Sequence, residues 1–311
     1  MKTLETQVSM KKIAYSICNL ISTLIHPVIK LWSYFGGHSR VRILVYHRVC
    51  PLPKENGVEY YNVHPSSFAD QIRFLTSNKY NVMSIDEVIE LISSNRPIPK
   101  RSICITFDDG YKNNYTHVFP VLSSQRIKAT FFLATSWIDN KNRFPWLRSD
   151  EELLEAERRS QDVSIPLCWS EVAEMDSAGM VFGNHSATHG DLSLMSLDQV
   201  RSDVLSGHRD LEAHVSRISR VFVCPFGVTP ERGRQLKLLI SELGYKGAIW
   251  GRVGSVGENT DPFDLPRISV YEGDSLEIFE RKIDGAYDWL GIAQPIWSDF
   301  SRLIFKMRRS V

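Results

Sequence analysis

Short apolar runs rich in β-branched residues recur along the chain, and each ends at polar or turn-forming residues. Four of them span residues 43–46, 102–107, 180–183 and 221–223. Runs of this length, closed by such residues, are typical of buried strands. Strand ends of this kind commonly meet at one mouth of a parallel β/α assembly. The pattern therefore predicts an α/β fold whose functional site lies at the carboxyl ends of the strands.

Two of these strand ends supply side chains that bind metals. Asp108 and Asp109 follow the second run and precede Gly110, and His185 follows the third run, with His189 four positions later. Two imidazoles at this spacing can face one point if the backbone turns helically, about 6 Å apart along the axis. Two histidines and one carboxylate can hold a zinc-type ion with a coordination position left for water. The second carboxylate is then a candidate general base.

Each motif alone has an ordinary structural explanation. Two aspartates before a glycine are most often a solvated turn or the N-cap of a helix. A single histidine near an apolar strand is usually a core or surface residue. The occurrence of both motifs in one chain favours a metal site. Two histidines and one carboxylate are also the ligands of non-haem iron oxygenases, but the extra aspartate favours hydrolysis, because oxygen activation gives it no evident role.

The composition limits the number of domains and the classes of partner. A chain of 311 residues with 43% hydrophobic residues can bury one large core. The 37 Lys and Arg residues nearly balance the 36 Asp and Glu residues, so we expect no nucleic-acid partner. The five cysteines are scattered, odd in number and without C-x-x-C spacing, which weakly favours a reducing compartment.

Both ends of the chain carry apolar residues at helical spacing. Lys11 and Lys12 precede an apolar run over residues 13–25, which is short for a membrane span and is not followed by an Ala-x-Ala cleavage site. The apolar positions of the two ends are Ile13, Ile17, Leu20, Ile21, Leu24 and Ile25, and Trp297, Phe300, Leu303, Ile304 and Met307. Helices in a membrane interface and helices packed on the domain explain both patterns equally well. We therefore expect a cytoplasmic or membrane-associated protein, with peripheral membrane contact left open and a secretory signal not supported.

Four segments together resemble the polysaccharide deacetylases of carbohydrate esterase family 4, the NodB homology domain. In family order they are residues 43–49, 106–110, 182–189 and 265–268. The resemblance covers residues 41–290, between an N-terminal segment 1–40 and a basic C-terminal tail 291–311. It implies a distorted (β/α) barrel that removes N-acetyl groups from an amino-sugar glycan. Motif by motif, it implies that Asp109, His185 and His189 bind a divalent metal and that Asp108 is the base.

The chain departs from the usual family pattern at two motifs. Val223-Cys224-Pro225-Phe226 replaces the family's Arg-Pro-Pro-Tyr, and no histidine follows His214 to supply the usual late general acid. The first strand resembles the branch of the family that carries a Tyr-His dipeptide. That resemblance implies that His47 is the acid and that Arg267 orients Asp108. The alternative is that His47 is a structural hydrogen-bonding residue.

The remaining predictions concern the metal and the substrate. We expect Zn²⁺, with Co²⁺, Ni²⁺ and Mn²⁺ as alternatives. The backbone N–H of Phe226, after Pro225, is expected to stabilise the oxyanion. Trp146, in a long insertion at residues 140–167, and Tyr111 are candidates to stack on sugar faces, although such aromatic residues more often anchor a core or a loop. The expected substrate is an N-acetylated polysaccharide, a cell-envelope or exopolysaccharide precursor, or a lipid-linked sugar. The intact ligand and base residues argue against a non-catalytic sugar-binding relative.

Overall fold

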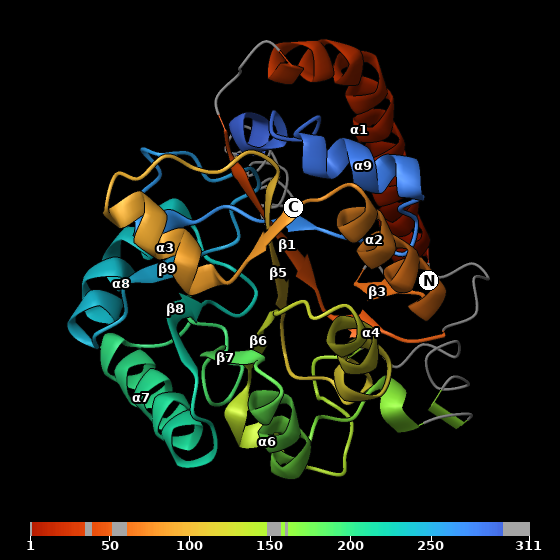
Figure 1. Ribbon diagram of the computed structural model, residues 1–311. Coiled ribbons are helices and arrows are strands. Elements are labelled where there is room, and N and C mark those ends of the chain that lie inside the picture. The colour runs from red at the N-terminus through yellow and green to blue at the C-terminus, as the bar shows by residue number, and fades with distance from the viewer. Residues whose placement is uncertain (1, 35–38, 52–60, 148–156, 159–160, 295–311) are drawn as a thin grey trace.

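The described part of the chain forms one curled, parallel sheet with helices around it (Figure 1). The computed structural model describes residues 2–34, 39–51, 61–147, 157–158 and 161–294. The sheet has eight strands in the order β10-β1-β5-β6-β7-β8-β9, and β4 also pairs with β5. The strands are β1 (Val41–Tyr46), β4 (Asn81–Met83), β5 (Ser102–Phe107), β6 (Thr130–Leu133), β7 (Val181–Asn184), β8 (Ile218–Val223), β9 (Gly247–Ile249) and β10 (Ile268–Ser269). A separate two-stranded sheet pairs β2 (Arg48–Val49) with β3 (Asn62–Val63).

Every pairing within the large sheet is parallel. β1 and β5 pair over their whole length, from Val41 opposite Ser102 to Tyr46 opposite Phe107. Their carboxyl ends therefore lie side by side, as the sequence predicts. The strand order ends at β9 and β10, which do not pair with each other within the described residues. The predicted distorted barrel is confirmed in the form of an open half-barrel.

Helices connect the strands and cover the sheet (Figure 1). They are α1 (Lys2–Tyr34), α2 (Pro65–Ser77), α3 (Ile85–Ser93), α4 (Phe119–Ser124), α6 (Trp169–Ser177), α7 (Leu197–His214), α8 (Pro230–Glu242) and α9 (Leu276–Asp284), with short turns at Asn114–Val118, Thr135–Trp137, Gln161–Val163 and Pro262–Asp264. Serine residues cap α3 and α7 in capping boxes: the side chains of Ser84 and Ser196 accept hydrogen bonds from the backbone N–H of Glu87 and Gln199. Residues 148–156 of the long insertion and the C-terminal apolar positions from Trp297 to Met307 lie outside the described residues.

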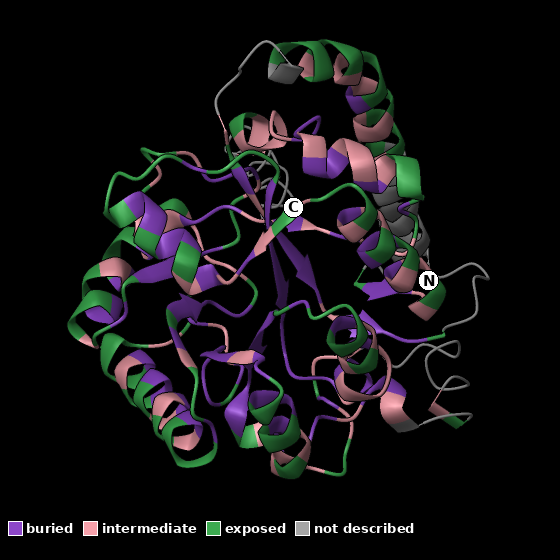
Figure 2. Ribbon diagram, in the orientation of Figure 1, coloured by how far each residue is buried: buried purple, intermediate pink, exposed green. Residues whose placement is uncertain are grey.

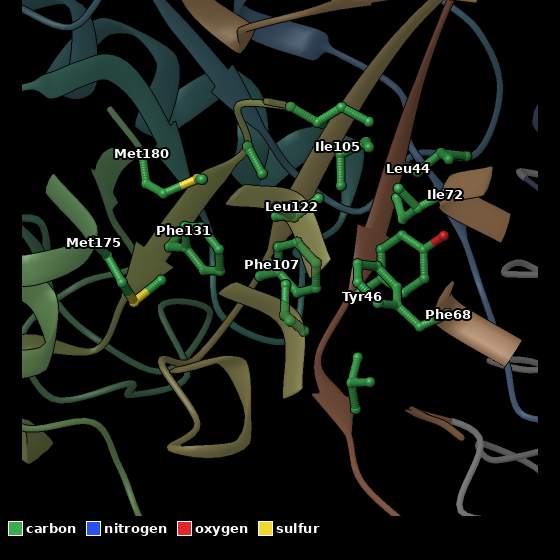
Figure 3. Close-up of a cluster of buried hydrophobic side chains, with 14 of the residues drawn as sticks. Leu44, Tyr46, Phe68, Ile72, Ile105, Phe107, Leu122, Phe131, Met175 and Met180 are labelled. Carbon is green, nitrogen blue, oxygen red and sulfur yellow. The ribbon is translucent and has the colours of Figure 1, made fainter. Parts of the chain in front are cut away.

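Aromatic side chains from neighbouring strands fill the main core (Figure 3). The ring of Phe107 stacks on Tyr46 at 5.2 Å and on Phe131 at 4.8 Å between ring centroids. All six residues of β5 are buried, because both faces of a parallel strand are covered. Figure 2 shows the buried strands surrounded by helices with exposed outer faces. The core therefore holds the central strand ends rigidly, and those ends carry the candidate site.

Candidate functional site

The turn after β5 aims two carboxylates into the mouth of the half-barrel. Asp109 and Gly110 have φ angles of 75° and 87°, in the left-handed region that most residues avoid. A Cβ at Gly110 would lie 2.9 Å from Leu133 Cδ2, so both the angle and the available space require glycine. The backbone N–H of Asp108 donates to Tyr46 O at 3.0 Å. The side chains of Asp108 and Asp109 are thereby fixed and almost fully buried.

A loop, and not a helical turn, carries the two histidines. His185 follows β7 directly and donates its backbone N–H to Leu133 O at 3.0 Å. Ser186 and His189 have φ angles of 63° and 57°, and the hydroxyl of Ser186 accepts the backbone N–H of His189 at 2.9 Å. The prediction that both rings face one point is confirmed, but the helical backbone proposed to achieve this is wrong. Two left-handed residues fold the loop back on itself instead.

The side chains of Asp109, His185 and His189 meet at one point. Oδ1 of Asp109 lies 3.3 Å from Nε2 of His185 and 3.1 Å from Nε2 of His189. One potential ligand atom from each residue lies within 4.8 Å of the others, and all three residues are buried. Nδ1 of His185 lies 2.8 Å from Val223 O. A carbonyl oxygen can only accept, so this nitrogen carries the proton and Nε2 presents a lone pair to the centre.

This arrangement fits a divalent cation. In the neutral His185 ring, Nε2 faces a carboxylate oxygen, and two acceptors at this distance repel unless a cation lies between them. Burial opposes the charge on Asp109, but the two imidazoles hold its pKa well below the ordinary value. Burial would also lower the pKa of His185, but the charges of Asp109 and Asp108 raise it. The three buried residues therefore form a site that favours binding of a positive charge.

Asp108 points to the same mouth but has a different partner. Nη1 of Arg267 donates to its Oδ1 at 2.7 Å and Nη2 to its Oδ2 at 2.6 Å. Burial opposes the charge on Asp108, and the guanidinium is the main cause that holds the pKa of this carboxyl below its ordinary value. The predicted contact between Arg267 and Asp108 is therefore present. The role of Asp108 as base remains a prediction.

His47 lies directly after β1 at the rim of the site. Its backbone oxygen accepts Nδ2 of Asn114 at 2.9 Å, and its ring lies 4.6 Å from the ring of Tyr61. Burial lowers the pKa of His47, against the opposing charges of Asp109 and Asp108. Tyr61 also feels the charge of Asp109, which adds to burial in raising the pKa of its hydroxyl. Tyr61 could not be identified from the sequence, because it follows a segment without periodicity and carries no motif.

The predicted aromatic contacts divide into two groups. Trp146 stacks on the ring of His189 at 3.9 Å, and Phe226 meets that ring edge-on at 4.7 Å. Phe226 is 64% exposed, so it stands at the open side of the site. Tyr111 is only 3% exposed, packs on Phe144 and lies under the guanidinium of Arg48. The prediction that Tyr111 stacks on a sugar is wrong, because its ring faces are covered.

The turn of the third motif leaves one backbone donor available. Phe226 has a φ angle of 58°, and its N–H has no hydrogen-bond partner within the described residues. Pro225 before it is buried. A cleft of about 710 Å³ opens beside Phe226 and is lined by Val228, Arg234, Lys237 and Trp250, among others. None of Asp109, His185 and His189 lines this cleft, but Phe226 lines it and also contacts the ring of His189.

Comparisons with known proteins agree with this geometry. Residues 95–248 match the family model for polysaccharide deacetylase. Poly-beta-1,6-N-acetyl-D-glucosamine N-deacetylase of Escherichia coli K12 is 34% identical over 80 residues, which is 26% of this chain but only 12% of that protein. The enzyme of the same name from Staphylococcus aureus MRSA252 is 22% identical over 232 residues, 74% of this chain and 75% of that protein.

A solved structure shares the fold. Streptococcus pyogenes deacetylase PplD in complex with acetate aligns with a TM-score of 0.64 at 21% identity, over 79% of this chain and 99% of that one. The half-barrel, the order of its motifs and the family match lead to one assignment. The chain belongs to the polysaccharide deacetylase family of NodB type.

Proposed function

We propose that the protein is a metal-dependent N-deacetylase that hydrolyses acetamido groups of an N-acetylated glycan. The convergence of Asp109, His185 and His189 beside a carboxylate held by Arg267 is the observation that carries this proposal. A bare ligand set would also suit an oxygenase. A second, precisely oriented carboxylate is what hydrolysis needs in addition.

The three ligand residues would hold Zn²⁺ through Oδ1 of Asp109 and Nε2 of each histidine. Such an ion polarises a carbonyl group and acidifies water when bound. Asp108 accepts the proton of the attacking water, since its two oxygens are ionised and fixed by Arg267. The water oxygen bonds to the amide carbon, and the backbone N–H of Phe226 donates to the developing oxyanion.

Breakage of the C–N bond requires a proton on the amine nitrogen. We assign this proton to His47, at the rim of the site after β1. Burial lowers the pKa of His47, which makes its protonated ring a stronger acid while reducing the fraction that is protonated. The products are acetate and a free amino sugar, so the atoms of amide and water balance.

The substrate class is inferred from the relatives and from the surface around the site. Two relatives are named for deacetylation of poly-β-1,6-N-acetylglucosamine. Exposed Phe226 and half-buried Trp146 flank His189, and aromatic faces of this kind pack on sugar rings. A net charge of +1 provides no long-range attraction for a polyanion. We therefore propose a neutral glycan built from N-acetylglucosamine.

The test is acetate release from a panel of β-1,6- and β-1,4-linked N-acetylglucosamine oligomers, peptidoglycan fragments and polyprenyl-linked N-acetylglucosamine. Metal-stripped protein is compared with protein reloaded with Zn²⁺, Co²⁺, Ni²⁺ or Mn²⁺. We expect release from the β-1,6 oligomers only with metal present, and none from Asp109→Ala protein. Release at an equal rate without metal would contradict the proposal, and so would a requirement for O₂.

A further inference from the structure

Helix α1 attaches to the domain through its polar side. Five of its side chains contact α9 or residues beside it. They are Tyr15 to Asp274 (2.6 Å), Asn19 to Tyr287, Ser22 to Trp289 (3.4 Å), His26 to Asp284 (2.8 Å) and Lys30 to Glu280 (2.6 Å). These positions recur every three or four residues and form one face of the helix. Figure 1 shows α1 running beside α9.

The opposite face of α1 is apolar and exposed. It carries Ile17 (51% exposed), Leu20 (61%), Leu24 (69%), Val28 (68%) and Leu31 (59%). We call these five residues the outer stripe. They also recur every three or four residues, centred about 160° around the helix from the polar contacts, over about 21 Å. Figure 2 shows the exposed residues along α1.

This orientation is the reverse of that found in an ordinary surface helix. Such a helix buries its apolar face and leaves its polar face in water. Here five polar side chains contact the domain, and the five residues of the outer stripe face away from it. An apolar stripe of this length exposed to water is unfavourable and marks a surface that is covered in the working protein.

The composition of the helix identifies what covers the stripe. Residues Ala14–Trp32 are long and apolar enough to cross a membrane, with a mean hydropathy of 1.2, yet only 6% of the segment is buried. A crossing orientation would take Asn19, His26 and Lys30 away from their partners and into hydrocarbon, which is costly. An orientation parallel to the surface keeps every polar contact and immerses only the outer stripe.

We propose that the outer stripe seats the protein on a lipid bilayer, with α1 lying in the interface and its polar side holding the catalytic domain. The stripe enters the acyl boundary, and the α9 contacts fix the domain against it.

A series of aromatic ring contacts connects α1 to the rim of the candidate metal site. Tyr15 of α1 lies 6.2 Å from Tyr271, Tyr271 lies 6.1 Å from Tyr61, and Tyr61 lies 4.6 Å from His47. These contacts link the helix proposed to lie in the interface to the rim of the site. This step rests on the proposed function. If the protein deacetylates glycans, a site linked to an interfacial helix favours acetylated sugars presented at a membrane surface over freely diffusing ones.

The experiment is flotation of the full chain with vesicles of phosphatidylcholine, with and without phosphatidylglycerol. The test variant is Leu20→Gln/Leu24→Gln, and the matched control is Leu194→Gln/Leu238→Gln, which changes leucines that are 83% and 70% exposed elsewhere. Glutamine leaves the net charge unchanged. We expect the wild type and the control to float with both kinds of vesicle, and the test variant to bind at least about tenfold more weakly.

Four results would overturn the proposal. Two concern binding: a wild type that stays with the soluble fraction, and equal binding by the test variant and the wild type. The third is a wild-type dimer in light scattering that the test variant converts to monomer, since the stripe would then meet a second copy. Binding that appears only after deletion of residues 295–311 would also overturn it, since the chain's own tail would be the cover. Acetate release from soluble oligomers, measured on the same samples, reports the proposed function separately and should be equal in all variants.

Discussion

Arg267 donates hydrogen bonds to both carboxylate oxygens of Asp108, at 2.7 and 2.6 Å, although 159 positions separate the two residues. The contact is possible because β10, which begins at Ile268, pairs with β1, and β1 pairs with β5, which ends just before Asp108. Both groups are nearly excluded from water. A planar guanidinium in this position fixes the plane of the carboxylate as well as its charge.

Replacement of Arg267 by lysine should slow turnover while leaving the metal in place. Lysine keeps the positive charge but cannot make both hydrogen bonds, each of which contributes about 1.5–3 kcal/mol to a charged partner. Loss of one such bond in the transition state lowers kcat about tenfold to a hundredfold. Steady-state kinetics with metal analysis of the same samples checks this. Arg252→Lys, at the half-exposed pair with Asp264, is the control and should leave both quantities unchanged.

Removal of the metal should abolish acetate release and lower the thermal midpoint. One potential ligand atom from each of three buried residues lies at one point, and a bound cation would interact with all three. Binding to the folded state alone stabilises it by about 2.7 kcal/mol when free metal is 100 times Kd. Scanning calorimetry with chelator and then with Zn²⁺ measures the shift. The shift should disappear in His189→Ala protein. A wild-type thermal midpoint that does not change between chelator and Zn²⁺ would contradict the metal site.

The strand ends could be predicted from the sequence because they depend on local pattern. The same holds for the approach of the aspartate motif to the histidine motif. Apolar runs identify β1, β5, β7 and β8, and a parallel sheet brings their carboxyl ends together whatever the loops do. The approach of Asp109 and His185 follows from this geometry, whereas their assignment with His189 as metal ligands follows from the family resemblance.

Features that depend on distant partners could not be predicted. The left-handed Ser186 and His189 arise from how their loop closes, and four-residue spacing alone suggested a helix. In the sequence, Tyr111 is a candidate to stack on a sugar ring, but Phe144 and Arg48 cover its ring in the fold. Periodicity revealed an apolar face on α1, but its outward direction is set by acceptors on α9, about 250 residues later.

Gly207 offers a test of how rigidly the histidine loop must be held. A Cβ there would lie 2.6 Å from Asn184 Oδ1 and 3.1 Å from Ala187 N, so α7 packs directly on the loop. Gly207→Ala should destabilise the fold by about 1–3 kcal/mol and weaken Zn²⁺ binding, measured by denaturant melts and metal titration. Gly233→Ala in α8 is the matched control. Its Cβ would meet only ordinary contacts at 3.5 Å, so alanine should leave stability unchanged or raise it by up to about 1 kcal/mol. Equal effects of the two changes would show that the loop tolerates displacement.

The roles of His47 and Asp108 can be separated by the leaving group of the substrate. An amine must be protonated before it departs, whereas 4-nitrophenolate leaves without a proton. His47→Ala should therefore lose about 100-fold or more in acetamide hydrolysis and retain most of its activity on 4-nitrophenyl acetate. Asp108→Asn should lose both activities, because attack by water precedes departure in each case. Tyr61→Phe, beside His47, controls for disturbance of the rim and should keep both activities. Equal losses on the two substrates in His47→Ala protein would refute the acid assignment and favour a structural role for this ring.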